Sequence, residues 1–253
     1  MRDAETQGLV LYSRNYKEKD KLVKIFTASF GKRMFFIKNF GKSPFASSLQ
    51  AFTDGKLTAT INDSGFSFIE DVSEVTVYKN INADIFINAY ASYIISLADA
   101  AISDNQYDPA LYAFLKRSLE LLDQKFDMEI ITNIFELQIL GRFGISINFA
   151  ECAFCHTTTG PFDYSYKFNA CLCKKHFDED LRRTHLDPNV IFLCNLFQEI
   201  SLDELKKISI KPEMKQKLRQ FIDGLYDEYV GLHLKSKKFL DSMQPGSWAD
   251  IMK

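Results

Sequence analysis

Long apolar runs are missing from this sequence. No window of the 253 residues approaches the roughly 18 to 20 consecutive apolar side chains that a membrane-spanning helix needs. The N-terminal segment, residues 1–5, also lacks the apolar core of a secretory signal. We therefore expect no membrane segment and a cytoplasmic protein.

An excess of one charge is missing too. The 31 Lys and Arg residues are balanced by 33 Asp and Glu residues, which gives a net charge of −2. This balance argues against a uniformly basic coat protein for nucleic acids. With 46% apolar and 25% charged residues, the composition is that of a folded globular protein and excludes collagen-like and coiled-coil chains.

Sequence signatures of catalysis are also absent. There is no Gly-rich phosphate loop, no His-Glu-x-x-His motif and no nucleophile elbow around Ser165. None of the four histidines supplies the His-x-Glu that zinc deaminases place ahead of their cysteine pair. Several acidic residues of the predicted helices are interpreted as solvated faces: Asp99, Asp104, Asp108, Asp127 and Glu136. These observations favour a binding protein over an enzyme.

Cysteine is scarce, but its spacing is informative. In a reducing cytoplasm, clustered cysteines favour a metal site over disulfides. Cys152 and Cys155 form a Cys-x2-Cys pair, and Cys173 and His176 form a Cys-x2-His pair after 17 intervening residues. Two such pairs supply four ligands that can converge tetrahedrally on one zinc ion. Because a closed set of four ligands leaves no position for water, we predict a structural zinc.

Alternatives stay open at this zinc-binding segment. Cys171 could replace one ligand, and His156 could compete with Cys155. The cysteines could also be unliganded remnants of a lost site. Cys194 lies in an apolar run and is interpreted as a buried core thiol.

Basic charge is concentrated near the N-terminus. Between Arg14 and Lys42 there are nine Lys and Arg residues against two acidic ones, a local charge of +7. Such runs are usually solvated surface. In this run, however, aromatic side chains are interleaved with the cations, an arrangement that holds single strands without sequence readout. Many of these rings must also fill the core. The rings are Tyr12, Tyr16, Phe26, Phe30, Phe35, Phe36, Phe40 and Phe45.

The first 80 residues favour β-structure. Short runs rich in Val, Ile, Phe, Tyr and Thr are separated by Gly-containing turns, which predicts a small barrel of five strands. The expected strands are Gly8–Ser13, Leu22–Thr27, Lys32–Phe40, Lys56–Ile61 and Phe66–Tyr78.

From about Ile81 the apolar period becomes helical. Apolar side chains recur at helical spacing over residues 85–97, 111–122 and 130–140, which predicts a helical bundle. Pro109 fits the start of the second helix.

Two further helices are expected near the C-terminus. Pro188 opens an apolar helix, and Pro212 opens a long amphipathic helix running towards Leu240. The tail after Gln244 is expected to be loosely held.

The order of these parts resembles the RecO family of bacterial DNA repair and recombination proteins over essentially the whole chain. The resemblance is carried by a small N-terminal barrel, a helical bundle and the Cys-x2-Cys/Cys-x2-His insert. The segments that match best are Thr6–Leu11, Asp20–Thr27, Gly31–Arg33 and Phe135–Phe149 leading into Cys152.

The resemblance implies an α+β multidomain protein. Its parts would be an OB-fold DNA-binding domain at residues 1–80, a first helical region at 81–150, a zinc-binding module at 151–180 and a second helical region at 181–253. It also implies a non-enzymatic protein that binds single- and double-stranded DNA and anneals complementary strands. Its implied partners are single-stranded DNA-binding protein, RecR and RecF, with which it helps RecA to load.

Site residues follow from the same resemblance. The zinc positions fall on Cys152, Cys155, Cys173 and His176, where many relatives have a cysteine at the last place. The DNA contacts are assigned by charge alone to Arg14, Lys21, Lys24, Lys32, Arg33 and Lys38. Two other functions are kept beside this one: a zinc-dependent nucleic-acid enzyme and a zinc module that reads DNA sequence.

Overall fold

The computed structural model describes residues 1–206 and 208–243. It separates into two compact units, which are described one at a time: residues 1–128 with 234–243, and residues 129–233. The tail after Gln244 lies outside the described residues. The sequence-based domain boundaries at residues 80, 150 and 180 stay predictions.

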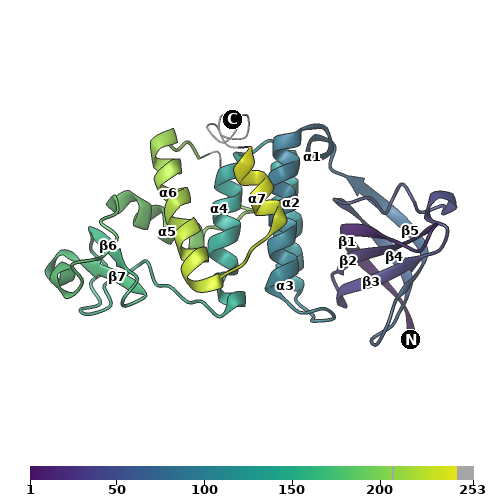
Figure 1. The fold of residues 1–253 in the computed structure, drawn as a ribbon, viewed down its shortest axis with the longest axis horizontal. Coiled ribbons are helices and arrows are strands. Elements are labelled where there is room, and N and C mark those ends of the chain that lie inside the picture. Colours follow the sequence, from purple (N-terminus) through teal and green to yellow (C-terminus); the bar gives the residue numbers. More distant parts are fainter. Residues whose placement is uncertain (207, 244–253) are drawn as a thin grey trace. The chain divides into compact units, whose positions relative to one another are not determined.

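Five antiparallel strands form a sheet domain at the N-terminus, in the order β3-β2-β1-β4-β5 (Figure 1). Strand β3 also meets the segment just before β5. There the Ser67 carbonyl accepts a hydrogen bond from the Phe36 N–H at 3.0 Å, and the Ser67 N–H donates to the Met34 carbonyl at 2.9 Å. This contact closes the sheet into a small barrel. The predicted strands are found as β1 (Arg2–Tyr16), β2 (Asp20–Thr27), β3 (Gly31–Ile37), β4 (Thr53–Ile61) and β5 (Phe68–Val77).

Strand alternation separates the two faces of this sheet. Val23 and Ile25 of β2 and Phe35 of β3 are fully buried inside the barrel. Burial of each such side chain is favourable by about 1.5–3 kcal/mol. Residues of the opposite parity, such as Lys24 and Phe36, project from the outer face.

In the described part of the first unit, the sheet is followed by the helices α1 (Lys79–Ala83), α2 (Ile85–Ala101), α3 (Pro109–Asp123) and α7 (Lys235–Ser242). Helix α2 begins where the Asp84 carboxylate accepts hydrogen bonds from two backbone N–H groups of the first turn. Helix α3 begins at Pro109, as predicted, and is capped by Asp108. Helix α7 lies beside α2 although it comes from the end of the chain (Figure 1).

The second unit contains α4 (Met128–Ile139), β6 (Phe162–Ser165), β7 (Ala170–Cys173), α5 (Pro188–Glu199) and α6 (Pro212–Leu225). Glu136 of α4 is fully buried and accepts hydrogen bonds from the Arg219 guanidinium of α6 at 2.5 and 2.9 Å. The Tyr226 hydroxyl donates to the backbone carbonyl of Glu136 at 2.9 Å. This hydrogen-bonded ion pair fixes α6 against α4.

The prediction of one long helix from Pro212 towards Leu240 is wrong. Helix α6 ends at Leu225 and continues as a π-helical turn, Tyr226–Val230. Gly231 then adopts a left-handed conformation (φ 65°), and its N–H donates to the Tyr226 carbonyl at 2.8 Å. A glycine in this conformation terminates a helix, so α7 is a separate element.

Within the described residues, no helix combines the length and the apolar character that crossing a bilayer requires. Along the chain, the sheet domain comes before a set of amphipathic and buried helices, and the β6–β7 hairpin comes between α4 and α5.

Candidate metal centre and nucleic-acid surface

Four side chains of the second unit bring their ligand atoms together. The Sγ atoms of Cys152, Cys155 and Cys173 and a ring nitrogen of His176 lie within 4.8 Å of one another. The Cys155 and Cys173 sulfurs are 3.7 Å apart, and His176 Nδ1 is 3.4 Å from the sulfurs of both Cys152 and Cys173. Tetrahedral zinc, with bonds of about 2.0–2.3 Å, separates its ligands by about 3.6–3.8 Å. The donor set could therefore hold one metal ion, and these three separations are close to those of tetrahedral zinc.

The local backbone explains this convergence. The first pair lies on a tight turn that is closed by a hydrogen bond to the Cys152 carbonyl and joined to β7 by a hydrogen bond to the Cys171 carbonyl. Cys173 is the last residue of β7, and His176 lies on the short 3-10 helix Lys174–Glu179 that follows directly. The β6–β7 hairpin thus holds the two ligand turns against each other.

Electrostatics favour a thiolate at Cys152. Burial raises the pKa of this thiol, but hydrogen bonds from nearby backbone N–H groups outweigh burial, and the pKa falls to about 6. Metals bind the thiolate and not the thiol. The cluster therefore presents a ligand that is already charged near neutral pH.

The two alternative ligands take no part in this cluster. Cys171 is buried, and burial together with the charge of Asp163 raises the pKa of its thiol to about 12, which keeps it protonated. His156 is exposed, with Nδ1 3.3 Å from a carboxylate oxygen of Glu151. Among the described residues, the group that could hold a metal ion is the set of four predicted from the two pairs.

The cations predicted to contact DNA divide into two groups. Three are buried, with exposed fractions of 7%, 1% and 5%: Lys24, Lys32 and Arg33. Three reach solvent: Arg14 and Lys38 are exposed, and Lys21 is half-buried. The structure therefore does not bring all six onto one surface.

Lys24 and Lys32 bind carboxylates at the end of α2. The Lys24 ammonium is 3.0 Å from Asp99 and 2.7 Å from Asp104, and the Lys32 ammonium is 2.9 Å from Asp99. Lys32 also donates to the backbone carbonyls of Asp99 and Ile102. Because both ammonium groups are buried, leaving them without these partners would be costly, so both cations join the sheet to the helical segment.

Arg33 is held within the sheet domain. Its guanidinium donates to the carbonyls of Phe30 at 2.8 Å and Asn62 at 3.1 Å. It also pairs with the Asp63 carboxylate at 2.9 Å. These contacts orient Arg33 towards the loop between β4 and β5.

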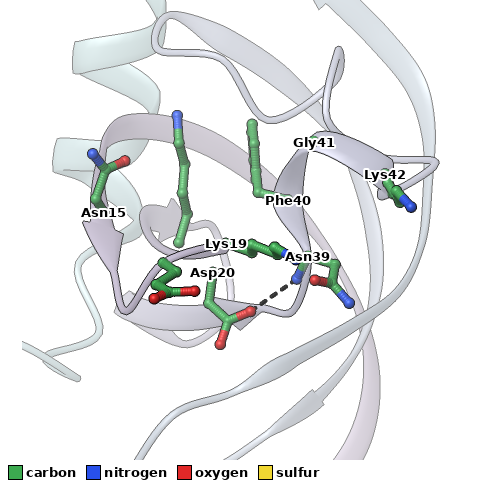
Figure 2. A pocket seen from close by; sticks show the side chains of 9 residues that line it. Asn15, Lys19, Asp20, Asn39, Phe40, Gly41 and Lys42 are labelled. Atoms are coloured by element: carbon green, nitrogen blue, oxygen red, sulfur yellow. Dashed lines mark hydrogen bonds between the residues drawn. The ribbon is translucent and has the colours of Figure 1, made fainter.

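An open pocket of about 530 Å³ lies where β1 turns into β2 (Figure 2). The Lys21 ammonium is 4.4 Å from the centre of the Phe40 ring, and Asp20 accepts a hydrogen bond from the Asn39 N–H at 2.9 Å. Three lysines against two acidic residues give the lining a charge of +1, which favours anions. The lining consists of Asn15, Glu18, Lys19, Asp20, Lys21, Asn39, Phe40, Gly41 and Lys42.

Comparison with known proteins assigns both parts of the chain. Residues 1–78 match the family described as "Recombination protein O N terminal", and residues 82–238 match "Recombination protein O C terminal". The chain belongs to the RecO family. The DNA repair protein RecO of Lactococcus lactis subsp. cremoris (strain MG1363) is 86% identical over 253 residues, the whole of both chains. That of Streptococcus suis (strain 05ZYH33) is 59% identical over all of this chain and 96% of its own.

These findings confirm the predicted resemblance and fold class. The sheet domain is the OB-like N-terminal part of RecO, and the helical part that follows carries the Cys/His cluster. The RecO relatives are named for DNA repair, and their names indicate no catalytic activity.

Reasoning from the sequence missed how this RecO chain uses its carboxylates. Asp99 and Asp104 are not simply solvated helix faces, because they bind the buried ammonium groups of Lys24 and Lys32. For Glu136 the interpretation is wrong, because this side chain is fully buried. One signal was available: both lysines lie in strands whose other residues are largely apolar. The choice of carboxylate depends on tertiary contacts that the sequence does not display.

Proposed function

We propose that this chain is a DNA-binding mediator of recombination in the bacterial cytoplasm. It binds single- and double-stranded DNA, anneals complementary strands, and helps a recombinase to load on strands coated by single-stranded DNA-binding protein. Its proposed partners are RecR, single-stranded DNA-binding protein, RecF and RecA. Membership of the RecO family supports this proposal.

The observation that carries the proposal is a group of cations at one end of the sheet domain. They lie on the end of β1, the β1–β2 turn, the start of β2 and the segment after β3, and three of them, Lys19, Lys21 and Lys42, line the pocket of Figure 2. Five are exposed and Lys21 is half-buried, so their charge is available to a ligand. We call them the rim cations: Arg14, Lys17, Lys19, Lys21, Lys38 and Lys42.

The rim cations suit a ligand that offers many phosphates. Each phosphate they neutralise releases condensed counterions, so binding is favourable at low salt and independent of sequence. Two complementary strands repel each other through their phosphates. A protein that neutralises part of this charge brings the strands together while their bases stay free to pair.

We also propose that the Cys/His cluster holds one structural zinc ion. Cys152, Cys155, Cys173 and His176 would supply all four ligands, and the bound ion would cross-link the two turns of the module. A zinc-dependent enzyme needs an open coordination position for water, which a saturated Cys3His set does not provide. The metal therefore braces the fold, and the DNA chemistry stays non-covalent.

Salt titration of DNA binding by the full chain tests the proposed function. We expect Arg14→Gln with Lys38→Gln to weaken binding to all sequences alike and to lower the salt slope by about one unit per lost phosphate contact. Annealing should slow in parallel. Lys79→Gln with Lys125→Gln is the matched control, because these two lysines are also exposed but lie outside the sheet domain.

Three results would overturn the proposal. Equal effects of the two double variants would show that the rim cations have no special role. A large difference in affinity between DNA sequences would favour a sequence-reading zinc module, and hydrolysis of DNA would favour a zinc enzyme.

A further inference from the structure

Four aromatic side chains contact one another on the outer face of the sheet domain. The Tyr16 ring lies 5.9 Å from Phe36 and 5.8 Å from Phe66, measured between ring centres, and both contacts are edge-on. Phe36 is stacked on Phe66 at 6.3 Å, with 20° between the ring planes, and meets the edge of Phe68 at 6.3 Å. We call Tyr16, Phe36, Phe66 and Phe68 the ring cluster.

Closure of the barrel creates this cluster. Ser67 is fully buried where its backbone pairs with β3, so its neighbours Phe66 and Phe68 both project outward. Phe36 projects outward from β3 beside them, because Phe35 points into the core. Segments 50 residues apart in the chain, at Tyr16 and Phe66, thus meet on one surface.

The ring cluster does not serve the core. Phe66 and Phe68 remain 36% and 40% exposed, and Tyr16 and Phe36 are only half-buried. The buried cluster that stabilises the barrel contains none of these four rings. These aromatic side chains contact one another but leave apolar surface exposed to water, and they do not add to the buried core that stabilises this unit. A contiguous exposed apolar patch of this kind is typical of a binding surface.

Cations lie next to the rings on the same face. Arg14 pairs with Leu22 across β1 and β2, and Leu22 pairs with Phe36 across β2 and β3, so Arg14 and Phe36 project from one face. Tyr16 shares this face with Arg14, two residues earlier, and the Lys17 ammonium is 5.5 Å from the Tyr16 ring centre. Rings bordered by cations complement a ligand that combines flat bases with phosphates.

A second copy of the chain is a poorer occupant. A symmetric contact through this face would enclose Arg14 and Lys17 of both copies in one interface and so concentrate positive charge there. Like charges brought together in this way disfavour association, whereas a polyanion is attracted.

We propose that the ring cluster is a base-stacking platform that makes single-stranded nucleic acid the preferred ligand of the sheet domain. This inference rests on the proposed function and adds to it. In a duplex the bases are already stacked on one another, so the platform contributes nothing to duplex binding. When two strands pair, their bases stack within the duplex and no longer on the rings. The annealed duplex therefore dissociates from the surface that bound the single strand.

Binding of three probes to the full chain tests the platform. The probes are an oligothymidylate, an abasic strand with the same number of phosphates, and a duplex of the same length. Wild-type protein should bind the oligothymidylate more tightly than the abasic strand. Phe66→Leu with Phe68→Leu should weaken oligothymidylate binding about fivefold or more, because stacking on each ring contributes substantially. Binding to the abasic strand and the duplex should not change.

Control variants separate stacking from loss of fold or of apolar area. Phe66→Tyr with Phe68→Tyr keeps the rings and should keep the preference for bases. Phe86→Leu with Phe192→Leu removes two other exposed rings, 49% and 64% exposed, and should leave all three affinities unchanged.

The outcomes distinguish the platform from the proposed function. Wild-type protein that binds none of the probes would refute the proposed function and the platform together. Wild-type binding that the Phe66→Leu/Phe68→Leu variant retains in full would refute the platform alone. If this variant instead abolishes self-association in sedimentation and leaves DNA binding unchanged, the ring cluster is a contact between copies and the platform is refuted.

Discussion

The Lys32 ammonium lies 2.9 Å from a carboxylate oxygen of Asp99, 67 residues further along the chain, and only 1% of the Lys32 side chain is exposed. The same ammonium donates to the Ile102 carbonyl at 2.7 Å. A cation with this many buried partners is part of the scaffold. It fixes β3 to the end of α2, so the outer face of the sheet is partly covered by the helical segment of the same unit.

Replacing this cation should lower stability. We expect Lys32→Met to reduce the free energy of unfolding by about 1–3 kcal/mol, because the Ile102 carbonyl loses its buried hydrogen-bond donor and Asp99 loses one of its two lysines. Urea unfolding measures this difference. The exposed Lys38→Met serves as the control and should stay within about 0.5 kcal/mol of wild type. Equal stability of the two variants would contradict a scaffold role for Lys32.

Gly31 should be intolerant of any side chain. It begins β3 with φ +70°, and a Cβ atom there would lie 2.1 Å from the Gln106 carbonyl oxygen. We expect Gly31→Ala to lower the free energy of unfolding by about 1–3 kcal/mol or more. The added methyl group both strains the backbone and clashes with the connection between α2 and α3. Gly141→Ala is the matched control, since a Cβ at Gly141 meets no atom within 4 Å. Thermal unfolding of both variants checks the expectation.

The Lys24–Asp104 ion pair should make the free energy of unfolding depend on pH in acid solution. Burial raises the pKa of Asp104, but the hydrogen bond and charge of Lys24 outweigh burial and hold that pKa below 3.8. A carboxyl with a lowered folded-state pKa stabilises the fold above its unfolded pKa, and this contribution is lost as pH falls through the folded value. Asp104→Asn should therefore be less stable than wild type at neutral pH, and the difference should shrink as pH falls below 3.8 and vanish below the lowered pKa of the folded state.

The size of this effect is limited by solvent. The Asp104 side chain is 56% exposed, so we expect a difference of at most about 1 kcal/mol at neutral pH. Urea unfolding of both proteins over a pH series measures it, and added salt should reduce it. A difference that persists unchanged in acid would show that Asp104 acts through packing and not through its charge.

Local signals account for what the sequence predicts well. The five strands follow from β-branched and aromatic runs between Gly turns, and the Cys/His cluster follows from two pairs whose spacing fits single turns. Both depend on residues that are near in the chain. The burial of Lys32 and the exposure of Phe66 depend on residues far away in the chain. Asp99 neutralises the Lys32 ammonium, and closure of the barrel through Ser67 leaves Phe66 exposed. Charge and hydrophobicity alone therefore cannot separate a scaffold lysine from a rim cation, or a core ring from an exposed one.

The helix that we expect from Pro212 towards Leu240 shows the same limit. Its apolar period is continuous enough to predict one long helix, yet Gly231 takes a left-handed conformation that ends it. Helical periodicity reports which residues are buried. It does not report whether a single glycine adopts the left-handed conformation that ends a helix.

Loss of one predicted ligand should remove the metal, whereas loss of its neighbour should not. Cys173→Ala deletes a sulfur that lies 3.7 Å from Cys155 and 3.4 Å from His176, so the site keeps only three protein ligands. Cys171→Ala, two residues away, deletes a buried thiol outside the cluster. We expect native mass spectrometry to find one zinc ion in wild type and in Cys171→Ala, and none in Cys173→Ala.

Stability should follow the metal, because ligand binding to the folded state adds its free energy to folding. A chelator should lower the melting temperature of wild type and of Cys171→Ala by several degrees and leave Cys173→Ala unchanged. DNA binding through the rim cations should survive metal loss where the sheet domain stays folded, since the cluster and the rim lie in different compact units. Zinc retained by Cys173→Ala but lost from Cys171→Ala would reverse the assignment and make Cys171 the fourth ligand.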